Sequence, residues 1–458
     1  MSPWTIRRRR ICCFAVGRGM QSEDTMKISV IGCGYLGAVH ASAMAKLGHD
    51  VVGIDVDGAK VARLSAGEPP FFEPGLAELL TASIASGRLR FTTDPAAAAA
   101  AEVHFVAVGT PQTRDGHAAD LRYVNAAIDS LFPHLSPGDT VVGKSTVPVG
   151  TAAQLAERVR TTGARLAWNP EFLREGYAVH DTIEPDRLVY GVENGDEASV
   201  AVLDTVFAHA LELGTPRIVT DFATAELVKV SANAFLATKI SFINAMSEIA
   251  EAAGADVTQL ADAIGHDARI GRRFLSAGVG FGGGCLPKDI RAFTARAEEL
   301  GRGESVAFLK EVDAINLRRR QHVVELAVDE LGGSVVGRKI AVLGVTFKPH
   351  SDDVRDSPAL DVAVSLKGLG ANVVATDPKG IENARARHPQ LDYVENLEDA
   401  LRGADLVILV TEWPEYTGLD PAATWESVAG AVIIDGRNAL DPDAWTAAGW
   451  RYRGMGRR

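Results

Sequence analysis

A glycine-rich turn between an apolar segment and a helical segment is the feature that most constrains the fold of this chain. The apolar run 27–31 is followed by Gly32, Gly34 and Gly37 in the spacing G-x-G-x-x-G, and a helical pattern continues to about Leu47. The first glycine of this pattern makes a tight turn, the second lets backbone N–H groups approach a pyrophosphate, and the third lets helix and strand pack closely. The pattern predicts a strand–turn–helix unit that binds a dinucleotide, with a purely structural turn as the alternative.

An acidic residue after the next expected strand selects the dinucleotide. That strand is expected at 50–54 and leads to Asp55, eighteen residues beyond Gly37. A carboxylate at this position suits the two ribose hydroxyls of NAD and repels the additional phosphate of NADP. NAD is therefore the predicted cofactor.

Two more apolar runs of this half, 103–108 and 140–143, lead into small polar residues that include Thr110 and Thr146. Ligands bind at the carboxyl ends of the strands in open parallel sheets, although ordinary turns and helix caps explain such residues equally well. The segment 168–176 places Glu171 and Glu175 four residues apart around Arg174. Solvated charges at the start of a helix are the alternative there.

The segment 221–254 lacks Pro and Gly until its last residue, and its apolar residues recur every three or four positions. This pattern predicts one helix of about 30 residues, roughly 45 Å long at 1.5 Å per residue. Lys229 and Asn233 share one face of that helix, where such a pair can stabilise an oxyanion. A lysine that extends to solvent is the commoner role.

The second half repeats the alternation of strands and helices without the glycine fingerprint. Strands are expected at 339–345, 371–377, 406–410 and 431–435, and a helix at 358–369. Lys348, Arg355 and Arg437 are predicted to hold a different anionic ligand. We predict an α/β protein with two Rossmann-like doubly wound parallel-sheet domains, at 26–215 and 331–458, joined through a helical region at 216–330 that contains the long central helix.

A cysteine in a glycine-rich loop indicates covalent chemistry. Cys285 follows Gly282, Gly283 and Gly284 and precedes Lys288 and Asp289. A dehydrogenase that only converts an alcohol to a carbonyl has no use for a thiol, whereas a thiol that traps an aldehyde permits a second oxidation and then hydrolysis of a thioester. A small buried apolar cysteine is the alternative.

The net charge of the chain excludes some classes of binding partner. A formal net charge of −12 argues against nucleic acid or an anionic membrane, and no apolar run approaches the roughly 18 residues of a membrane span. Four cysteines at irregular spacing favour a reducing, cytoplasmic compartment. The apolar stretch 11–16 after Arg7–Arg10 is too short for a secretion signal, so residues 1–25 are expected to form a disordered basic extension. No metal site is predicted.

Taken together, these motifs resemble the UDP-glucose 6-dehydrogenase family of nucleotide-sugar dehydrogenases. The resemblance runs from about Lys27 to Arg437 and rests on the segments 32–37, 144–150, 169–176, 226–229 with 233–239, 281–289 and 347–349. It implies an N-terminal NAD domain, a central helix that forms much of a homodimer interface, and a C-terminal domain that binds the nucleotide sugar.

The resemblance also implies roles for individual residues. Cys285 would be the nucleophile, Lys229 and Asn233 the stabilisers of oxyanions, and Glu171 the base that activates water. Asp289 and Thr146 would order a water near the reacting carbon. The residues implied to line NAD are Gly32, Gly34, Tyr35, Leu36, Gly37, Asp55, Lys60, Thr110, Thr146, Glu175, Lys288 and Arg355. Those implied to hold the nucleotide sugar are Phe172, Leu173, Arg174, Lys229, Asn233, Arg269, Phe274, Gly278, Phe281, Gly282, Phe347, Lys348 and Arg437, with Arg269 reaching into the site of the partner subunit.

The implied reaction oxidises UDP-glucose to UDP-glucuronate with two NAD, through a thiohemiacetal and a thioester on Cys285. Lys288 is expected to favour the thiolate by charge proximity. Gly284 departs from the family, where Ser is common. Oxidation of GDP-mannose or a UDP-N-acetylhexosamine, a non-catalytic NAD sensor, and a one-step dehydrogenase of the 3-hydroxyacid type are the alternatives.

Overall fold

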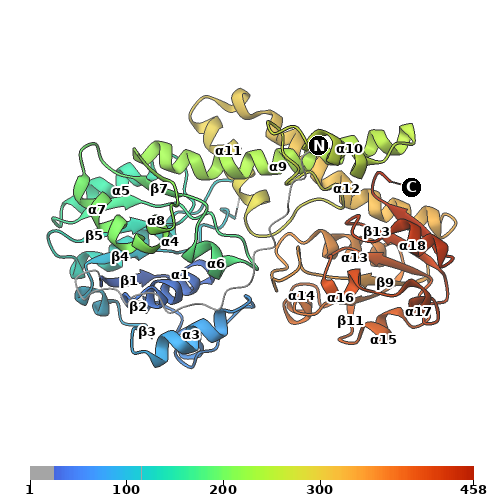
Figure 1. Ribbon diagram of the computed structural model, residues 1–458, viewed down its shortest axis with the longest axis horizontal. Coiled ribbons are helices and arrows are strands. Elements are labelled where there is room, and N and C mark those ends of the chain that lie inside the picture. Colours follow the sequence, from blue (N-terminus) through green and yellow to red (C-terminus); the bar gives the residue numbers. More distant parts are fainter. Residues whose placement is uncertain (1–24, 115, 458) are drawn as a thin grey trace, which may run out of the picture.

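The computed structural model describes residues 25–114 and 116–457, so the predicted extension, apart from Thr25, lies outside the described residues. Two sheets with flanking helices lie below a layer of long helices (Figure 1). The first sheet has the strand order β3-β2-β1-β4-β5-β6-β7-β8 and is parallel except between β6 and β7. Its strands are β1 (Lys27–Ile31), β2 (Asp50–Ile54), β3 (Leu89–Thr92), β4 (Val103–Val106), β5 (Thr140–Gly143), β6 (Arg165–Trp168), β7 (Leu188–Gly191) and β8 (Arg217–Thr220).

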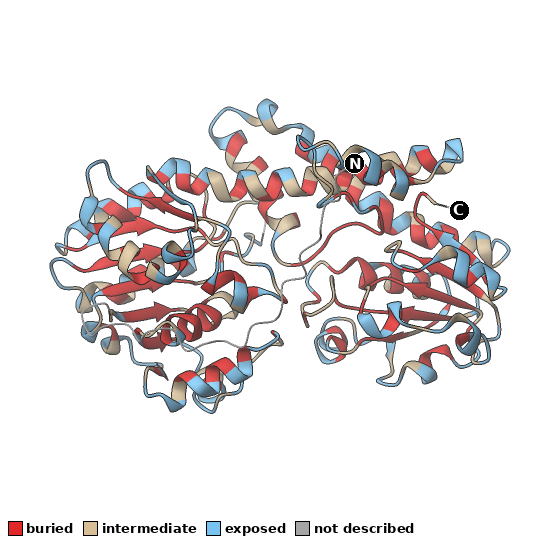
Figure 2. Ribbon diagram, in the orientation of Figure 1, coloured by how far each residue is buried: buried red, intermediate tan, exposed pale blue. Residues whose placement is uncertain are grey.

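Helices cover both faces of this sheet. Successive strand residues point to opposite faces, so the consecutive apolar residues of these strands make both faces apolar. Phe105 belongs to one hydrophobic core and Val106 to the other, and Val142 and Val141 divide in the same way. The strands of this sheet are largely buried (Figure 2). The helices and 3₁₀ turns of this unit are α1 (Tyr35–Lys46), α2 (Gly58–Ser65), α3 (Leu76–Ala85), η1 (Pro95–Ala100), α4 (Arg122–Leu131), η2 (Phe132–His134), α5 (Thr151–Arg160), α6 (Ala178–Ile183), α7 (Glu197–Val206) and α8 (Ala208–Glu212).

The second sheet repeats the arrangement of the first six strands, in the order β11-β10-β9-β12-β13-β14, and all of its pairs are parallel. Its strands are β9 (Lys339–Leu343), β10 (Asn372–Thr376), β11 (Asp392–Tyr393), β12 (Leu406–Leu409), β13 (Val432–Asp435) and β14 (Arg451–Gly454). Its helices are α13 (Pro358–Gly368), α14 (Ile381–Arg387), α15 (Leu397–Leu401), α16 (Pro414–Thr417), α17 (Pro421–Trp425) and α18 (Pro442–Ala447). The strand expected at 339–345 ends two residues early because Gly344 has φ 98°, a left-handed conformation that leaves the ladder.

A layer of long helices spans the two sheets (Figure 1). It contains α9 (Phe222–Ala253), α10 (Val257–Gly265), α11 (Leu286–Glu299), η3 (Gly303–Val306) and α12 (Phe308–Glu330). The Asp221 side chain accepts a hydrogen bond from Thr224 N and caps the start of α9, and Gly254, at φ 72°, ends the helix. The predicted fold class, including the long central helix, is confirmed.

Among the described residues, no helix combines the length and the apolar character that crossing a membrane would require.

Candidate active site

The glycine turn after β1 has the geometry that a dinucleotide needs. Gly32 has φ 88°, and a Cβ on Gly37 would lie 1.8 Å from the Gly32 carbonyl oxygen, so the first and third glycines allow the turn and the close helix. A Cβ on Gly34 would meet nothing within 4 Å, which leaves space beside the N-terminus of α1. This open space fits a pyrophosphate at the positive end of the helix dipole.

Asp55 connects the end of β2 with this turn. Its Oδ2 accepts hydrogen bonds from Cys33 N (2.7 Å) and Lys60 Nζ (2.8 Å), and its Oδ1 accepts one from Asp57 N (3.0 Å). The carboxylate is therefore held at the carboxyl end of β2, directly beside the glycine turn. Burial and then the Asp55 charge raise the pKa of the neighbouring Cys33 thiol to about 12, which makes that cysteine a packing residue.

The glycine-rich loop presents Cys285 at the N-cap of α11, where the residue is exposed. Segment 355–356 packs directly on the loop, because a Cβ on Gly282 would lie 2.1 Å from Asp356 O and one on Gly284 would lie 2.3 Å from Arg355 Cζ. The absent side chain at Gly284 thus leaves room for the Arg355 guanidinium next to the thiol.

The protein around Cys285 raises the pKa of its thiol. The largest cause is desolvation by the surrounding protein, and the Asp289 carboxylate adds to it. Lys229 opposes these effects, and Lys288 does so more weakly. Lys288 thus acts in the predicted direction, towards the thiolate, but desolvation and Asp289 outweigh its effect.

Polar groups from three elements converge at the first turn of α11. Asn233 Nδ2 on α9 donates to Asp289 Oδ2 (2.7 Å), and Lys288 Nζ pairs with Asp289 Oδ1 (2.7 Å) in the first turn of α11. Thr146, which follows β5, lines a small cavity together with Lys288 and Asp289. Thr110 Oγ1 donates to Thr146 O (2.8 Å) and links the ends of β4 and β5.

Glu171, after β6, is fixed by three donors. Phe172 N and Leu173 N donate to its Oε1 at 2.7 Å and 2.9 Å, and Lys144 Nζ lies 3.0 Å from its Oε2. Lys144 is almost fully buried and also donates to Asn169 Oδ1 (2.9 Å). The sequence analysis included Lys144 in the segment 144–150 without predicting a role for it. Its position directly after a buried strand could have suggested one.

The Phe172 ring lies among cations. The Arg187 guanidinium stands 3.8 Å from its centroid and Lys229 Nζ 5.5 Å from it. Leu173 packs in a small apolar cluster with Tyr35. Arg174 instead forms a two-point ion pair with Asp181, at 2.8 Å and 2.7 Å, while half of its side chain remains exposed.

A buried carboxylate that sequence reasoning missed orders this region. Glu73 accepts hydrogen bonds from Gly176 N (2.6 Å), Ala178 N (2.7 Å) and the Tyr35 hydroxyl. It therefore connects the helix that follows the glycine turn to the loop of Glu175. The signal was weak, a single acid between aromatic and proline residues.

The second sheet contributes the opposite side of the site. Arg437 donates to Val410 O (2.6 Å), Gly280 O (2.9 Å) and Phe347 O (3.0 Å), so it ties the thiol loop to the strand ends of β12 and β9. Lys348 follows Phe347, and desolvation is the main cause that lowers the pKa of its ammonium group. A guanidinium has five N–H donors, so Arg437 retains donors for a ligand.

Other predicted substrate residues lie in different environments. The Phe281 side chain is buried in the core between α9, α11 and α12, so only its peptide group contributes to the surface of the glycine-rich loop. Phe274 is partly exposed with φ 65°, and Gly278 packs on Gly436 O. Arg269 pairs with Asp267 in its own loop, and 88% of its side chain is exposed. Leu36 packs at the edge of the first core.

Comparison with known proteins shows the family to which the chain belongs. Three models of the UDP-glucose/GDP-mannose dehydrogenase family match: the NAD binding domain at residues 26–211, the central domain at 223–318 and the UDP binding domain at 341–442. The UDP-glucose 6-dehydrogenase of Rhizobium meliloti (strain 1021) is 42% identical over 438 residues, which cover 94% of this chain and 100% of that protein.

Solved structures of nucleotide-sugar dehydrogenases also resemble this chain. A UDP-glucose dehydrogenase from Pyrobaculum islandicum matches with a TM-score of 0.87 and 40% identity, covering 96% of this chain and 100% of that one. A UDP-D-ManNAc dehydrogenase from Pyrococcus horikoshii matches with a TM-score of 0.82 and 25% identity, covering 94% and 99%.

A mostly parallel sheet with a dinucleotide turn, and a second sheet near the same exposed thiol, define an NAD-dependent oxidoreductase with a separate substrate domain. The chain belongs to the UDP-glucose/GDP-mannose dehydrogenase family and is a nucleotide-sugar dehydrogenase.

Proposed function

We propose that this enzyme oxidises UDP-glucose to UDP-glucuronate in one site, with two NADH formed per sugar. The observation that carries the proposal is the exposed Cys285 at the start of α11, beside Lys229 and the Asn233–Asp289 pair. The names of the Rhizobium and Pyrobaculum relatives support UDP-glucose as the sugar nucleotide. In this assignment region 26–215 binds NAD and region 331–458 binds the nucleotide sugar, as the family models at 26–211 and 341–442 suggest.

The cofactor, when bound at the glycine turn and Asp55, supplies the electron acceptor for both oxidations. In the first, the alcohol proton leaves to Lys229 or to a water held by Asp289 and Thr146. The Cys285 sulfur then bonds to the aldehyde carbon as the C=O π bond opens, and the thiol proton ends on the former carbonyl oxygen, which Lys229 and Asn233 stabilise while it carries negative charge. Their position beside the thiol suits developing negative charge.

The second oxidation converts the thiohemiacetal to a thioester. Glu171 then takes a proton from water as the C–O bond forms, the C–S bond breaks, and Cys285 leaves as thiolate with the carboxylate as product. General base catalysis of this kind contributes roughly 10²–10⁴-fold. The remaining assigned residues bind NAD or the nucleotide sugar as the family resemblance implies.

Replacing Cys285 with Ser tests this route. Carboxylate formation should nearly disappear, because an alcohol oxygen gives no readily hydrolysed thioester. A variant with a tenth of wild-type turnover would remove the thioester from the mechanism. Counting NADH at completion gives two per sugar for the proposed reaction and one for a simple alcohol dehydrogenase.

The choice of sugar nucleotide needs its own assay. A turnover panel of UDP-glucose, GDP-mannose and UDP-N-acetylhexosamines should give the highest kcat/KM with UDP-glucose. Preference for another member would keep the chemistry and replace the substrate.

We also propose a cytoplasmic homodimer formed through α9. Phe235, Phe242 and Ile249 recur every seven residues along this helix and are 67%, 48% and 60% exposed, an apolar stripe that a second copy would cover. Arg269 extends into solvent, as a residue that serves the partner's site must. Phe242→Glu should yield monomers in sedimentation, and an unchanged mass would exclude this stripe as the interface. The free Cys285 thiol suits a reducing compartment.

A further inference from the structure

The loop that leads to Cys285 lies between elements without joining a sheet, and side chains hold its backbone. Asn244 Oδ1 accepts from Gly278 N (2.9 Å), Asn438 Nδ2 donates to Ala277 O (3.2 Å), and Arg437 donates to Gly280 O. Buried peptide groups need partners, so each such side chain fixes a point of the loop. The point nearest Cys285 along the chain is the peptide of Phe281.

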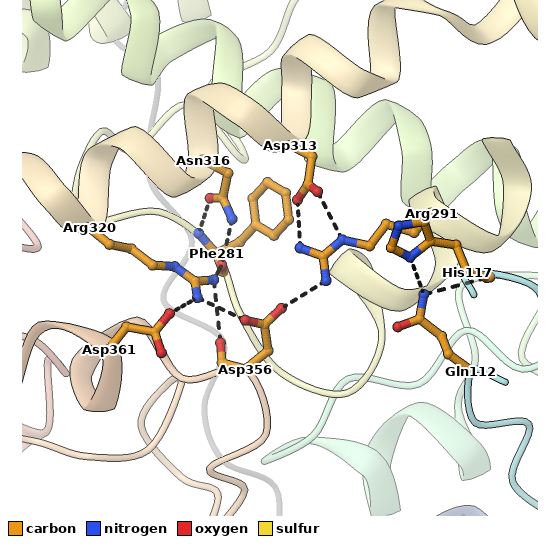
Figure 3. A network of polar contacts seen from close by, with 9 residues as sticks. All are labelled: Gln112, His117, Phe281, Arg291, Asp313, Asn316, Arg320, Asp356 and Asp361. Atoms are coloured by element: carbon orange, nitrogen blue, oxygen red, sulfur yellow. Dashed lines mark hydrogen bonds and ion pairs between the residues drawn. The ribbon is translucent and has the colours of Figure 1, made fainter. Parts of the chain in front are cut away.

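Asn316 on α12 binds Phe281 at two points. Its Oδ1 accepts from Phe281 N (2.7 Å) and its Nδ2 donates to Phe281 O (2.9 Å), as Figure 3 shows. The residue is fully buried. Gly280 has φ 98°, and a Cβ there would lie 2.4 Å from Asn316 Oδ1, so the loop reaches this carboxamide only without a side chain at Gly280.

Arg320, one helical turn further, extends the contact to the second sheet unit. Its Nη2 donates to Phe281 O (2.9 Å), and its Nη1 donates to Asp356 Oδ1 (2.8 Å) and pairs with Asp361 (Figure 3). Gly283 N in turn donates to Arg355 O (2.9 Å). The thiol loop and segment 355–356 are therefore held in one register by a side chain that is 5% exposed.

We propose that Asn316 and Arg320 are positioning residues that set the place of the Cys285 sulfur through the Phe281 peptide. This inference rests on the proposed nucleophilic role of Cys285. The Phe281 ring is anchored in the core formed by α9, α11 and α12, so the loop has a fixed end four residues before the thiol. Misplacing a reacting group by about 1 Å can cost 10²-fold in rate.

The first oxidation should depend less on the position of the Cys285 sulfur than the later steps do. The first oxidation makes no bond to sulfur, whereas aldehyde capture and the second oxidation both require the sulfur in place. A displaced loop should thus leave more aldehyde uncaptured and lower the yield of the second NADH.

Asn316→Asp is the sharpest test, because it keeps the shape and the acceptor for Phe281 N–H but turns a carboxylate oxygen towards Phe281 O. We expect kcat to fall at least about tenfold, with a smaller change in KM. Alkylation of Cys285 by iodoacetamide at fixed pH should change severalfold, and fewer than two NADH should form per sugar when hydroxylamine traps free aldehyde.

Ser241→Ala is the matched control. Ser241 is buried, and its Oγ donates to Val312 O (2.7 Å) between α9 and α12, so the change loosens α12 without touching the loop. It should lower Tm but keep the alkylation rate and the NADH yield.

An Asn316→Asp enzyme with lower Tm and unchanged alkylation and NADH yield would overturn the inference. If that variant does not fold, Arg320→Lys, which retains the charge but loses the forked donor, should show the same two defects, and unaltered readouts there would overturn it equally. A failure of the proposed function is seen separately, as wild-type enzyme that forms one NADH per sugar or an active Cys285→Ser variant.

Discussion

At the scale of single residues, the reactivity of Cys285 is a balance between desolvation and nearby charges. Desolvation and Asp289 raise the pKa of the thiol, and Lys229 lowers it. Among the neighbouring charges, Lys229 is the strongest that favours the thiolate. This balance gives Lys229 an effect on the nucleophile besides its proposed contact with the substrate oxygen.

Substitutions on either side of the balance should shift the alkylation profile of Cys285 in opposite directions. Lys229→Met removes the cation and should move the inflection to higher pH, whereas Asp289→Asn removes the anion and should move it to lower pH. Lys229→Met should also reduce kcat by about 10²-fold, the usual cost of losing an oxyanion donor. Stopped-flow or mass-spectrometric alkylation between pH 6 and 10 measures the shifts, and movement of both in one direction would contradict this account.

At the scale of elements, the turn between β1 and α1 contains glycines with two different functions, one in packing within the chain and one in leaving space for a ligand. Gly37 is required by the protein, because its Cα faces the Gly32 carbonyl. Gly34 is not required by contacts within the chain, and its φ of −70° suits any residue. The freedom at Gly34 therefore serves the ligand.

Alanine at these two positions should have different consequences. Gly34→Ala should keep Tm within about 1–2 °C, since substitutions without internal contacts stay within roughly ±0.5 kcal/mol, but should weaken NAD binding at least about tenfold by occupying pyrophosphate space. Gly37→Ala should lower both, because a backbone oxygen cannot move aside as a side chain can. Thermal unfolding with NAD titration by calorimetry makes the comparison, and normal NAD affinity in Gly34→Ala would refute the assigned site.

At the scale of the whole molecule, Glu175 joins the two sheet units across the site. Ser351 Oγ donates to its Oε2 (3.0 Å), and Arg355 Nη2 lies 3.5 Å from its Oε1. Desolvation first, and then Asp353, raise the pKa of Glu175 from 4.5 to about 7, against the opposing charges of Arg355 and Lys348. A change in the charge of Glu175 would therefore alter the contacts between the two sheet units.

The raised pKa predicts a direction for stability. The folded protein binds the Glu175 proton more tightly than the unfolded chain does, so this contribution is complete below about pH 4.5 and is lost as pH rises through about 7. Glu175→Gln cannot lose a proton, and its Tm relative to wild type should increase by a few degrees between pH 5 and pH 8. Exposed Glu157→Gln is the control and should show no such trend. A constant difference for Glu175→Gln in calorimetry would exclude the linkage.

The local elements could be predicted because their causes are local. Asp221 and Gly254 mark the ends of α9 in the sequence as they do in the structure, and the glycine spacing after β1, together with Asp55, identified the turn and the cofactor. These signals act over two to four residues, the range of caps, turns and helical periodicity. Family resemblance added the residue roles, which stay predictions; in the structure Asn233 donates to Asp289, and the Asp289 charge acts on Cys285.

The sequence by itself determined the central strands of both sheets, the long helix, the dinucleotide turn and the presence of a cysteine in a glycine-rich loop. Only the tertiary structure decided that Lys144 fixes Glu171, that Asn316 holds Phe281 from 35 residues away, and that Glu175 meets Ser351 across 176 residues. The physical reason is that crossover connections bring strand ends from distant parts of the chain to one edge. Side-chain partners at that edge are chosen by packing in three dimensions, which no local spacing records.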